Sequence, residues 1–227
     1  MSKDIFETPI VIIINHCKSR HFPLLLETIL RQPEIDPSKV IIYDNLTCTW
    51  SVFSLVKLFH FNYQIYKNNE SNTLESLFQN TYQLYPKANQ IILIEDSVVL
   101  SSDFFPFMGQ LLPLLHSSTS NVFAISAWNE NSLQNVSQDS TRLYRADVRK
   151  YKPRFGAMFK KGVTFCTLQK STLWSFDDVI TIPSNDMDII FPDISRVYFT
   201  LPYPNLISKT EQDYFLQSSM HLRTVSL

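Results

Sequence analysis

The chain has 227 residues, of which 44% are hydrophobic and 18% are charged, and its formal net charge is −1 at pH 7. This composition supports a sizeable folded core and excludes wholesale disorder, and the balanced charge gives no support for a nucleic-acid partner. With only three glycines, the sequence cannot contain a glycine-rich phosphate-binding loop of the Rossmann or P-loop type. Turns that need a positive φ angle are therefore expected to use Asn and Asp.

The three cysteines, Cys17, Cys48 and Cys166, are widely spaced and form no C-x-x-C pair. The spacing predicts neither a zinc site nor a disulfide framework, and we expect buried free thiols. The apolar run Ile10–Ile14 is too short for the hydrophobic region of a signal peptide or for a membrane span. The chain as written is predicted to be soluble, with no membrane segment. A catalytic domain taken from a longer, membrane-anchored protein would show the same sequence features.

Predicted strands and helices alternate through the first half of the chain. Continuous apolar runs indicate buried strands, and apolar residues at helical spacing indicate the helices between them. The predicted strands are 9–15, 40–45, 63–69 and 91–96, and the predicted helices are 23–32, 49–61 and 73–86. This alternation is typical of right-handed βαβ units and a mainly parallel sheet, so the predicted fold class is α/β.

Polar residues follow three of the predicted strands. Glu95 and Asp96 end the strand 91–96, Asp44 ends the strand 40–45, and Lys18 comes just after the first strand. Because ligands bind parallel sheets at the carboxyl ends of the strands, these residues are expected in the ligand crevice and not in the core. Two adjacent carboxylates suit a divalent cation or the hydroxyls of a sugar or ribose. A pair of acids in a surface turn, or capping a helix, is the alternative.

The second half is less regular. A helix is predicted over 101–116, with Asp103 as its cap, and a strand is predicted over 122–131. Short strands and turns are expected in 143–148, 154–163 and 165–171, and the segment 177–199 holds five aspartates. The tail from Leu201 is irregular, with a last helix expected over 211–223.

Four motifs in this order resemble a known family. They are Asp103-Phe104-Phe105, Ser126-Ala127-Trp128-Asn129-Glu130, Leu143-Tyr144-Arg145 and the block Pro-Asp-Ile-Ser-Arg at 192–196. Together with the acids at 95–96, this pattern is similar to that of the inverting β-1,2-N-acetylglucosaminyltransferases, over about residues 9–200. The resemblance implies one GT-A domain over 1–227. Its nucleotide-binding half is about 9–100, its acceptor half about 101–200, and its irregular tail 201–227.

The resemblance also implies ligands and a location. The donor would be UDP-GlcNAc, and the acceptor a mannose-type glycan or glycoprotein. A Mn²⁺ ion would neutralise the leaving diphosphate, and an aspartate would take a proton from the attacking hydroxyl. The family works in the Golgi lumen, and a cytoplasmic location stays open for this chain.

Site residues carry over from the family one at a time. Asp44 matches the aspartate that contacts uracil, and Glu95 and Asp96 match the first two acids of Glu-Asp-Asp, which touch sugar and ribose. Lys18 stands where the family has an arginine beside the nucleotide. The third acid is the family's direct metal ligand, and this chain has Ser97 there. Asp96 and Ser97 are therefore the candidate metal ligands, although a hydroxyl binds a hard cation weakly.

Other family positions differ more. Thr73 stands in place of a histidine, and the loop Arg154–Met158 lacks the family's tryptophan. The catalytic base is assigned by the resemblance to Asp177 or Asp178, with Asp186 and Asp188 as competitors. Trp128 is expected to pack in the core near the acceptor boundary; a sugar platform is the alternative.

Three hypotheses therefore stay open at the level of sequence. The first is an active transferase that uses the residues above. The second is a degenerate domain that binds a sugar or glycoprotein without transfer, indicated by Ser97 and Thr73. The third is a metal-independent transferase in which Lys18 or Arg154 holds the diphosphate.

Overall fold

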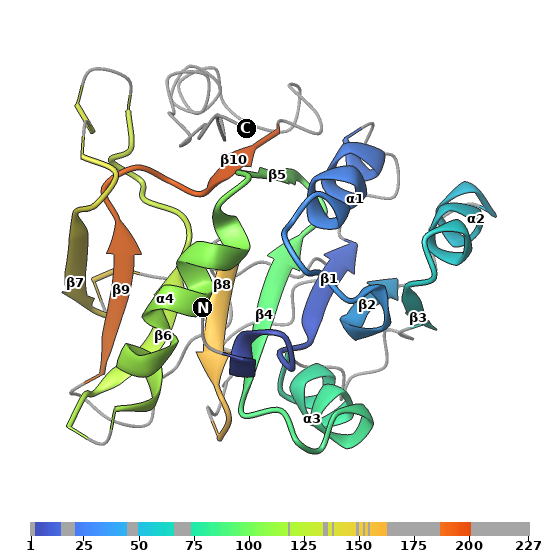
Figure 1. The fold of residues 1–227 in the computed structure, drawn as a ribbon, viewed down its shortest axis with the longest axis horizontal. Helices are drawn as coiled ribbons and strands as arrows, with labels where there is room; N and C mark the ends of the chain where they lie inside the picture. The colour runs from blue at the N-terminus through green and yellow to red at the C-terminus, as the bar shows by residue number, and fades with distance from the viewer. Residues whose placement is uncertain are drawn as a thin grey trace.

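The computed structural model describes residues 3–14, 21–44, 50–65, 74–117, 119–133, 136–137, 139–148, 150–151, 153, 155–162 and 187–200. Within these residues the protein is an α/β fold in which helices cover both faces of a central sheet (Figure 1). The helices are α1 (Phe22–Leu30), α2 (Trp50–Leu58), α3 (Leu74–Leu84) and α4 (Phe104–His116), with short 3-10 turns at Lys3–Ile5 and Pro37–Lys39.

Eight strands of the described chain form the central sheet, in the order β3-β2-β1-β4-β8-β6-β9-β7. Their bounds are β1 (Ile10–Ile14), β2 (Val40–Asp44), β3 (Asn62–Ile65), β4 (Gln90–Glu95), β6 (Val122–Ser126), β7 (Leu143–Asp147), β8 (Gly156–Lys160) and β9 (Asp188–Pro192). A separate antiparallel pair joins β5 (Val98–Leu100) to β10 (Val197–Phe199), beyond the carboxyl end of β4.

The sheet is mainly parallel, as predicted. β1 pairs in parallel with β2 and β4, β2 with β3, and β6 with β9. β8 runs antiparallel between β4 and β6, and β7 runs antiparallel to β9 at the edge. The carboxyl ends of β1, β2, β3, β4, β6 and β9 therefore all lie at one edge of the sheet. The prediction of a parallel α/β fold for the first half is confirmed.

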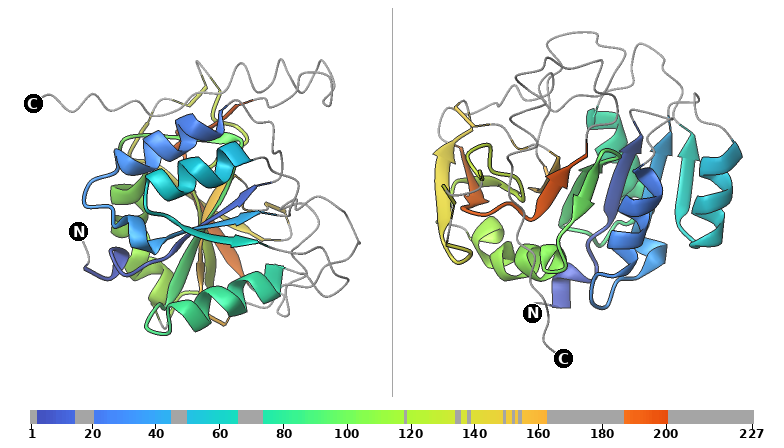
Figure 2. Two further views of the ribbon diagram at one scale, coloured as in Figure 1. Left: turned by 90° about the vertical axis from the view of Figure 1, so that its right-hand side faces the viewer. Right: turned by 90° about the horizontal axis from the view of Figure 1, so that it is seen from above.

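Alternation along the strands builds two cores. Ile10, Ile12 and Ile14 of β1 belong to one buried cluster, and Val11 and Ile13 belong to the other. The first cluster includes side chains of α1, α2 and α4, and the second includes those of α3. Figure 2 shows the same arrangement, with α3 on the face opposite the other three helices. The continuous apolar runs are explained by this burial on both faces.

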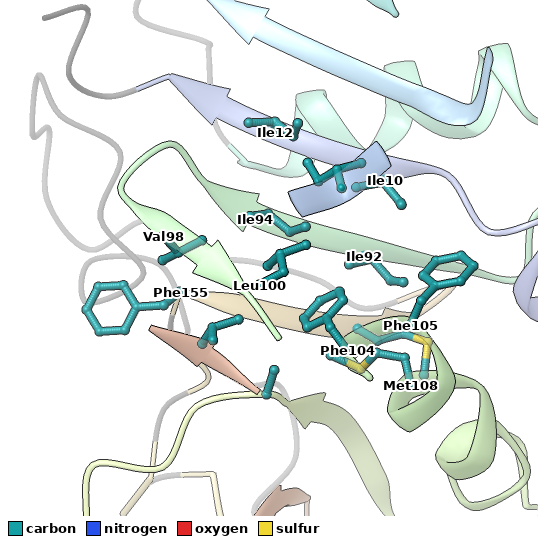
Figure 3. Packing of buried hydrophobic residues seen from close by; sticks show 14 of the residues in the cluster. Ile10, Ile12, Ile92, Ile94, Val98, Leu100, Phe104, Phe105, Met108 and Phe155 are labelled. Carbon is teal, nitrogen blue, oxygen red and sulfur yellow. The ribbon is translucent and has the colours of Figure 1, made fainter. Parts of the chain in front are cut away.

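Helix α4 supplies the largest aromatic part of the first core. Phe104 and Phe105 are 0% and 2% exposed, and they pack with Met108 against Ile92 and Ile94 of β4 (Figure 3). The side chain of Gln32 ties the start of this helix to α1, since its Oε1 accepts from the backbone N–H of Phe105 at 3.0 Å.

Three local predictions need correction. The expected helix over 101–116 is present as α4, but it begins only at Phe104, after the separate strand β5. Asp103 occupies the cap position but makes no capping bond with its side chain, because its carboxylate binds elsewhere. Positive φ angles in the described residues outside glycine occur at Glu34, His60 and Phe155, and not at Asn or Asp as expected.

No helix among the described residues is long and apolar enough to cross a membrane.

Gly156 provides a test of the packing at the start of β8. A Cβ atom there would lie 3.0 Å from Cγ1 of Val197 and 3.4 Å from Cε2 of Phe104. Both neighbours are fully buried, so they cannot move away easily. We expect Gly156→Ala to lower the free energy of unfolding by about 1–3 kcal/mol, the usual cost of overpacking a core. Urea unfolding measures this, and an unchanged midpoint would contradict it.

Candidate functional site

Three of the predicted donor residues, Asp44, Glu95 and Asp96, lie at the carboxyl edge of the sheet, on either side of β1. Asp44 is the last residue of β2 and pairs in register with Ile14, while Glu95 is the last residue of β4 and pairs with Ile13. The backbone N–H of Asp96 donates to the carbonyl of Ile13 at 3.1 Å. The parallel register therefore brings residues from positions 44 and 95–96 to the end of one central strand.

The acids are more deeply placed than the sequence predicted. Asp44 is 1% exposed and Asp96 is 0% exposed, so both residues are buried. Glu95 is half-buried. Strand alternation places Asp44 on the face of α1 and α2, with Ile42, whereas Glu95 is on the face of α3, with Leu93. The two acids thus flank the edge from opposite faces of the sheet.

Tyr63 of β3 contacts Asp44 directly. Its hydroxyl donates to Oδ2 of the carboxylate at 2.5 Å. Burial raises the pKa of Tyr63 well above its usual value, and the hydrogen bond to Asp44 and its negative charge raise the pKa further. The phenol therefore stays protonated and acts as a permanent donor to this carboxylate. Sequence analysis missed Tyr63, because its contact with Asp44 depends on the pairing of β2 with β3.

Ser97 lies at the turn between β4 and β5. Its backbone carbonyl accepts two hydrogen bonds from Thr200, from the N–H at 2.7 Å and from the hydroxyl at 2.8 Å. The Ser97 side chain is buried, with 1% of the residue exposed. The β5–β10 pair therefore holds the segment that follows Glu95 and Asp96 in a fixed position.

The motifs of the second half converge at the same sheet edge. The block 126–130 follows β6, and the block 192–196 ends β9. The side-chain amide of Asn129 donates to the carbonyl of Asp193 at 2.9 Å, and its backbone N–H donates to the hydroxyl of Ser195 at 3.0 Å. The backbone N–H of Arg196 donates to the carbonyl of Ala127 at 2.7 Å. Residues of these two motifs therefore join two strand ends.

Trp128 is a core residue, as expected. It is 1% exposed and packs edge to face on Phe155, with ring centroids 5.1 Å apart. The hydroxyl of Tyr151 donates to its backbone carbonyl at 2.5 Å. Phe155 adopts a φ angle of 60°, which is unusual for a bulky residue. Its contacts with Trp128 and with Phe199 hold this conformation beside the start of β8.

Arg196 and Asp103 form a mostly buried ion pair. The Nε atom of Arg196 lies 3.0 Å from Oδ2 of Asp103, and the side chains are 5% and 16% exposed. A second guanidinium nitrogen donates to the carbonyl of Ser140 at 2.7 Å, and the group lies 5.0 Å above the ring of Phe107. The carboxylate of Asp103 also accepts from the hydroxyl of Ser101 at 2.7 Å. This pair links two of the sequence motifs and explains why Asp103 does not cap α4.

The structure separates one competitor for the catalytic base from the site. Asp188 begins β9, so it lies at the opposite edge of the sheet from Asp44, and it forms an ion pair with Arg145 at 2.5 Å. Asp193 ends the same strand and is buried, but its two oxygens accept from the hydroxyl of Tyr144 and the backbone N–H of Asp139. Both aspartates thus have structural partners.

Several candidates lie outside the described residues. These are Lys18, Thr73, Arg154, Asp177, Asp178 and Asp186, together with the three cysteines, the expected strand 165–171 and the expected helix 211–223.

The described residues do not fit a manganese site. None of them forms a group of three or more His, Cys, Asp or Glu side chains that could hold a metal ion. Glu95 and Asp96 supply two carboxylates at the expected position, but the place of the third belongs to the buried Ser97. A hard cation prefers several carboxylate oxygens, and one hydroxyl is a poor substitute.

Solved structures define the class of the fold. Residues 1–349 of S. aureus TarS align with a TM-score of 0.52 at 12% identity, over 85% of this chain and 60% of that one. GalNAc-T7, solved with UDP, GalNAc and Mn²⁺, aligns with a TM-score of 0.50 at 11% identity, over 87% of this chain and 44% of that one. The fold is that of the GT-A glycosyltransferases.

Sequence comparison supplies the family. The model of the GNT-I family matches residues 57–204, which is more than half of the chain. The chain therefore belongs to the GNT-I family. It is also 26% identical over 114 residues to an alpha-1,3-mannosyl-glycoprotein 2-beta-N-acetylglucosaminyltransferase of Arabidopsis thaliana. That match covers 49% of this chain and spans only 25% of the curated relative.

The ion pair between Arg196 and Asp103 can be tested by stability. Arg196→Met leaves a carboxylate that is mostly buried without its counter-charge, so we expect the free energy of unfolding to fall by about 3–5 kcal/mol. Arg31→Met is the control, because its pair with Glu27 is exposed at 71% and 51%, and we expect a loss of at most about 1 kcal/mol. Equal losses in urea unfolding would contradict the role given to Arg196.

Proposed function

We propose that this chain transfers N-acetylglucosamine from UDP-GlcNAc to a mannose-type acceptor of a glycoprotein, with inversion at the anomeric carbon. The observation that carries the proposal is the placement of Asp44, Glu95 and Asp96 around the carboxyl end of β1 in a chain of the GNT-I family. The N-acetylglucosaminyltransferase relative supports the donor and the mannose acceptor. By resemblance to the family, we propose that the activity takes place in the Golgi lumen.

Each donor group has a proposed partner. The carboxylate of Asp44 accepts the imide N–H of uracil, which suits a strand end in a parallel sheet. Glu95 and Asp96 accept hydroxyl protons of the ribose and the sugar, because ionised carboxylates are acceptors only. Lys18 is the cation for the diphosphate. The structure of S. aureus TarS in complex with UDP-GlcNAc, at a TM-score of 0.51, supports a site for such a donor on this fold.

The proposed reaction is a single displacement. A hydroxyl oxygen of the acceptor attacks the anomeric carbon of GlcNAc, and the bond from that carbon to the diphosphate oxygen breaks. The electron pair leaves with UDP, and the proton of the attacking hydroxyl goes to Asp177 or Asp178 as general base. Cationic side chains stabilise the charge that develops on the departing diphosphate. This step uses the chain's own residues, since the described ones do not fit a metal site.

Two residues are proposed to neutralise the leaving diphosphate in place of the metal ion that the family resemblance implies. Lys18, or else Arg154, neutralises the leaving diphosphate, so transfer proceeds without Mn²⁺. Ser97 favours this form of the mechanism, because a neutral hydroxyl is a poor ligand for a hard cation. A second candidate function follows from the same observation: a degenerate GT-A domain that binds sugar or glycoprotein and transfers nothing.

The general base is tested by a transfer assay. UDP-GlcNAc and a synthetic α-mannoside are incubated with the protein, and the added N-acetylhexosamine is detected by mass spectrometry. We expect transfer by the wild type and a loss of at least about 100-fold in the Asp177→Asn, Asp178→Asn double variant, because a positioned base contributes about 10²–10⁴-fold. Unchanged turnover in the double variant would remove these residues from the mechanism. No transfer by the wild type, with UDP-GlcNAc still bound, would favour the degenerate domain.

Ser97 is tested by restoring the family's acid. Ser97→Asp adds a third carboxylate beside Glu95 and Asp96, so we expect a Mn²⁺ affinity that the wild type lacks. Isothermal titration with MnCl₂ in the presence of UDP measures it, and Ser102→Asp in the following turn serves as the control. Equal Mn²⁺ binding by the wild type and both variants would show that position 97 does not determine metal use.

A further inference from the structure

We infer that Thr200, the residue that follows β10, is a positioning residue for donor binding: its hydroxyl fixes the turn that carries Asp96, directly after Glu95. Thr200 and the turn are 103 residues apart in the sequence, and the fold brings them together. The inference rests on the proposed function, because it gives a role at the donor site to a residue outside the acids assigned there.

The turn at 96–97, between β4 and β5, is held on both sides. On one side, the backbone N–H of Asp96 donates to the carbonyl of Ile13 in β1 at 3.1 Å. On the other side, the carbonyl of Ser97 accepts from the N–H of Thr200 at 2.7 Å and from the Thr200 hydroxyl at 2.8 Å. The backbone between these two anchors belongs to Asp96 and Ser97 alone, so their position depends on both contacts.

The hydroxyl of Thr200 supplies one of the two bonds at the second anchor. A carbonyl oxygen has two lone pairs, and here a single residue supplies a donor for each of them. Thr200 is 8% exposed and Ser97 is 1% exposed, so water has little access to replace a donor that is lost. Because a buried acceptor that loses a partner costs free energy, removing the hydroxyl favours a shift of the turn, and Asp96 moves with it.

The position of Thr200 is set by the second half of the domain. Strand β10 pairs with β5 in antiparallel register, with Phe199 opposite Val98, beyond the end of β4 (Figure 1). This strand begins directly after Arg196, whose backbone N–H donates to the carbonyl of Ala127 at 2.7 Å. The hydroxyl of Thr200 therefore joins a turn of the donor half to a strand that the acceptor half holds in place.

The experiment measures the affinity for UDP-GlcNAc by calorimetric titration and, separately, stability by urea unfolding. Thr200→Val removes the hydroxyl and keeps the shape of the side chain, whereas Thr200→Ser keeps the hydroxyl. We expect Thr200→Val to weaken UDP-GlcNAc binding about three- to tenfold, the range for one net hydrogen bond, and Thr200→Ser to bind as the wild type does. If Thr200→Val does not fold, Thr200→Ala against Thr200→Ser makes the same comparison.

Thr8→Val is the matched control. Thr8 is 1% exposed, and its hydroxyl donates to the carbonyl of Asp4 at 3.1 Å. It precedes β1, so it lies at the opposite edge of the sheet from the turn. We expect Thr8→Val to lose stability and to keep the wild-type affinity. Equal losses of affinity in Thr8→Val and Thr200→Val would reflect stability alone and would overturn the inference.

A double-mutant cycle tests whether Thr200 acts through the turn. Effects within one contact network are not additive, whereas effects at separate sites add. We expect the losses of affinity from Thr200→Val and Asp96→Asn to combine to less than their sum, because both changes act on the same turn. The losses from Thr200→Val and Asp44→Asn are expected to add. Additivity with Asp96→Asn would show that Thr200 does not act through the turn, and the inference would fail.

The remaining outcomes separate the two levels of the account. If Thr200→Val binds UDP-GlcNAc as tightly as the wild type, the contact is only structural, and this inference fails while the proposed function stands. A wild type that binds no UDP-GlcNAc overturns the proposed function, and the inference with it.

Discussion

The candidate site depends on the parallel pairing of β1 with β2 and β4. This pairing puts the last residues of three strands side by side, so Asp44 and Glu95 flank Ile14 and Ile13 although about fifty residues separate them in sequence. A one-residue slip in either pairing would turn every side chain of that strand to the other face of the sheet. The two buried cores prevent such a slip, because alternate residues of β1 belong to different cores. The hydrophobic pattern of the strands thus fixes the position of the acids at their ends.

A second set of contacts joins the two halves of the domain. The strand β5, which follows the acids at 95–96, pairs with β10, and β10 follows the block at 192–196. Arg196 at the end of this block reaches Asp103 before α4 and the carbonyl of Ala127 after β6. The motifs at 103–105, 126–130 and 192–196 are therefore connected to one another by a hydrogen bond and an ion pair. Much of their chemistry supports the shape of the sheet edge, and the donor role is proposed for the smaller set around β1.

The sequence predicted this architecture well where a long apolar run or a helical period was present. The alternation in residues 9–96 identified each strand and helix of the first half, with ends displaced by a few residues. The separate strand β5 was missed because Val98–Leu100 is short and pairs only with β10, about a hundred residues later. The burial of Asp44 and the hydrogen bond from Tyr63 could not be read from spacing, because they depend on which strands are neighbours. Asp103 was predicted to cap the helix, but its carboxylate pairs instead with Arg196, which is distant in the sequence.

The central claim is that the carboxyl edge around Asp44 binds a uridine nucleotide sugar, and calorimetric titration of UDP-GlcNAc into the wild type and into Asp44→Asn tests it most directly. An amide at this position replaces a charged acceptor of the uracil N–H by a weaker one. The account predicts saturable binding by the wild type and an affinity at least about tenfold lower in the variant. Absence of binding by the wild type, or equal binding by both proteins, would contradict it.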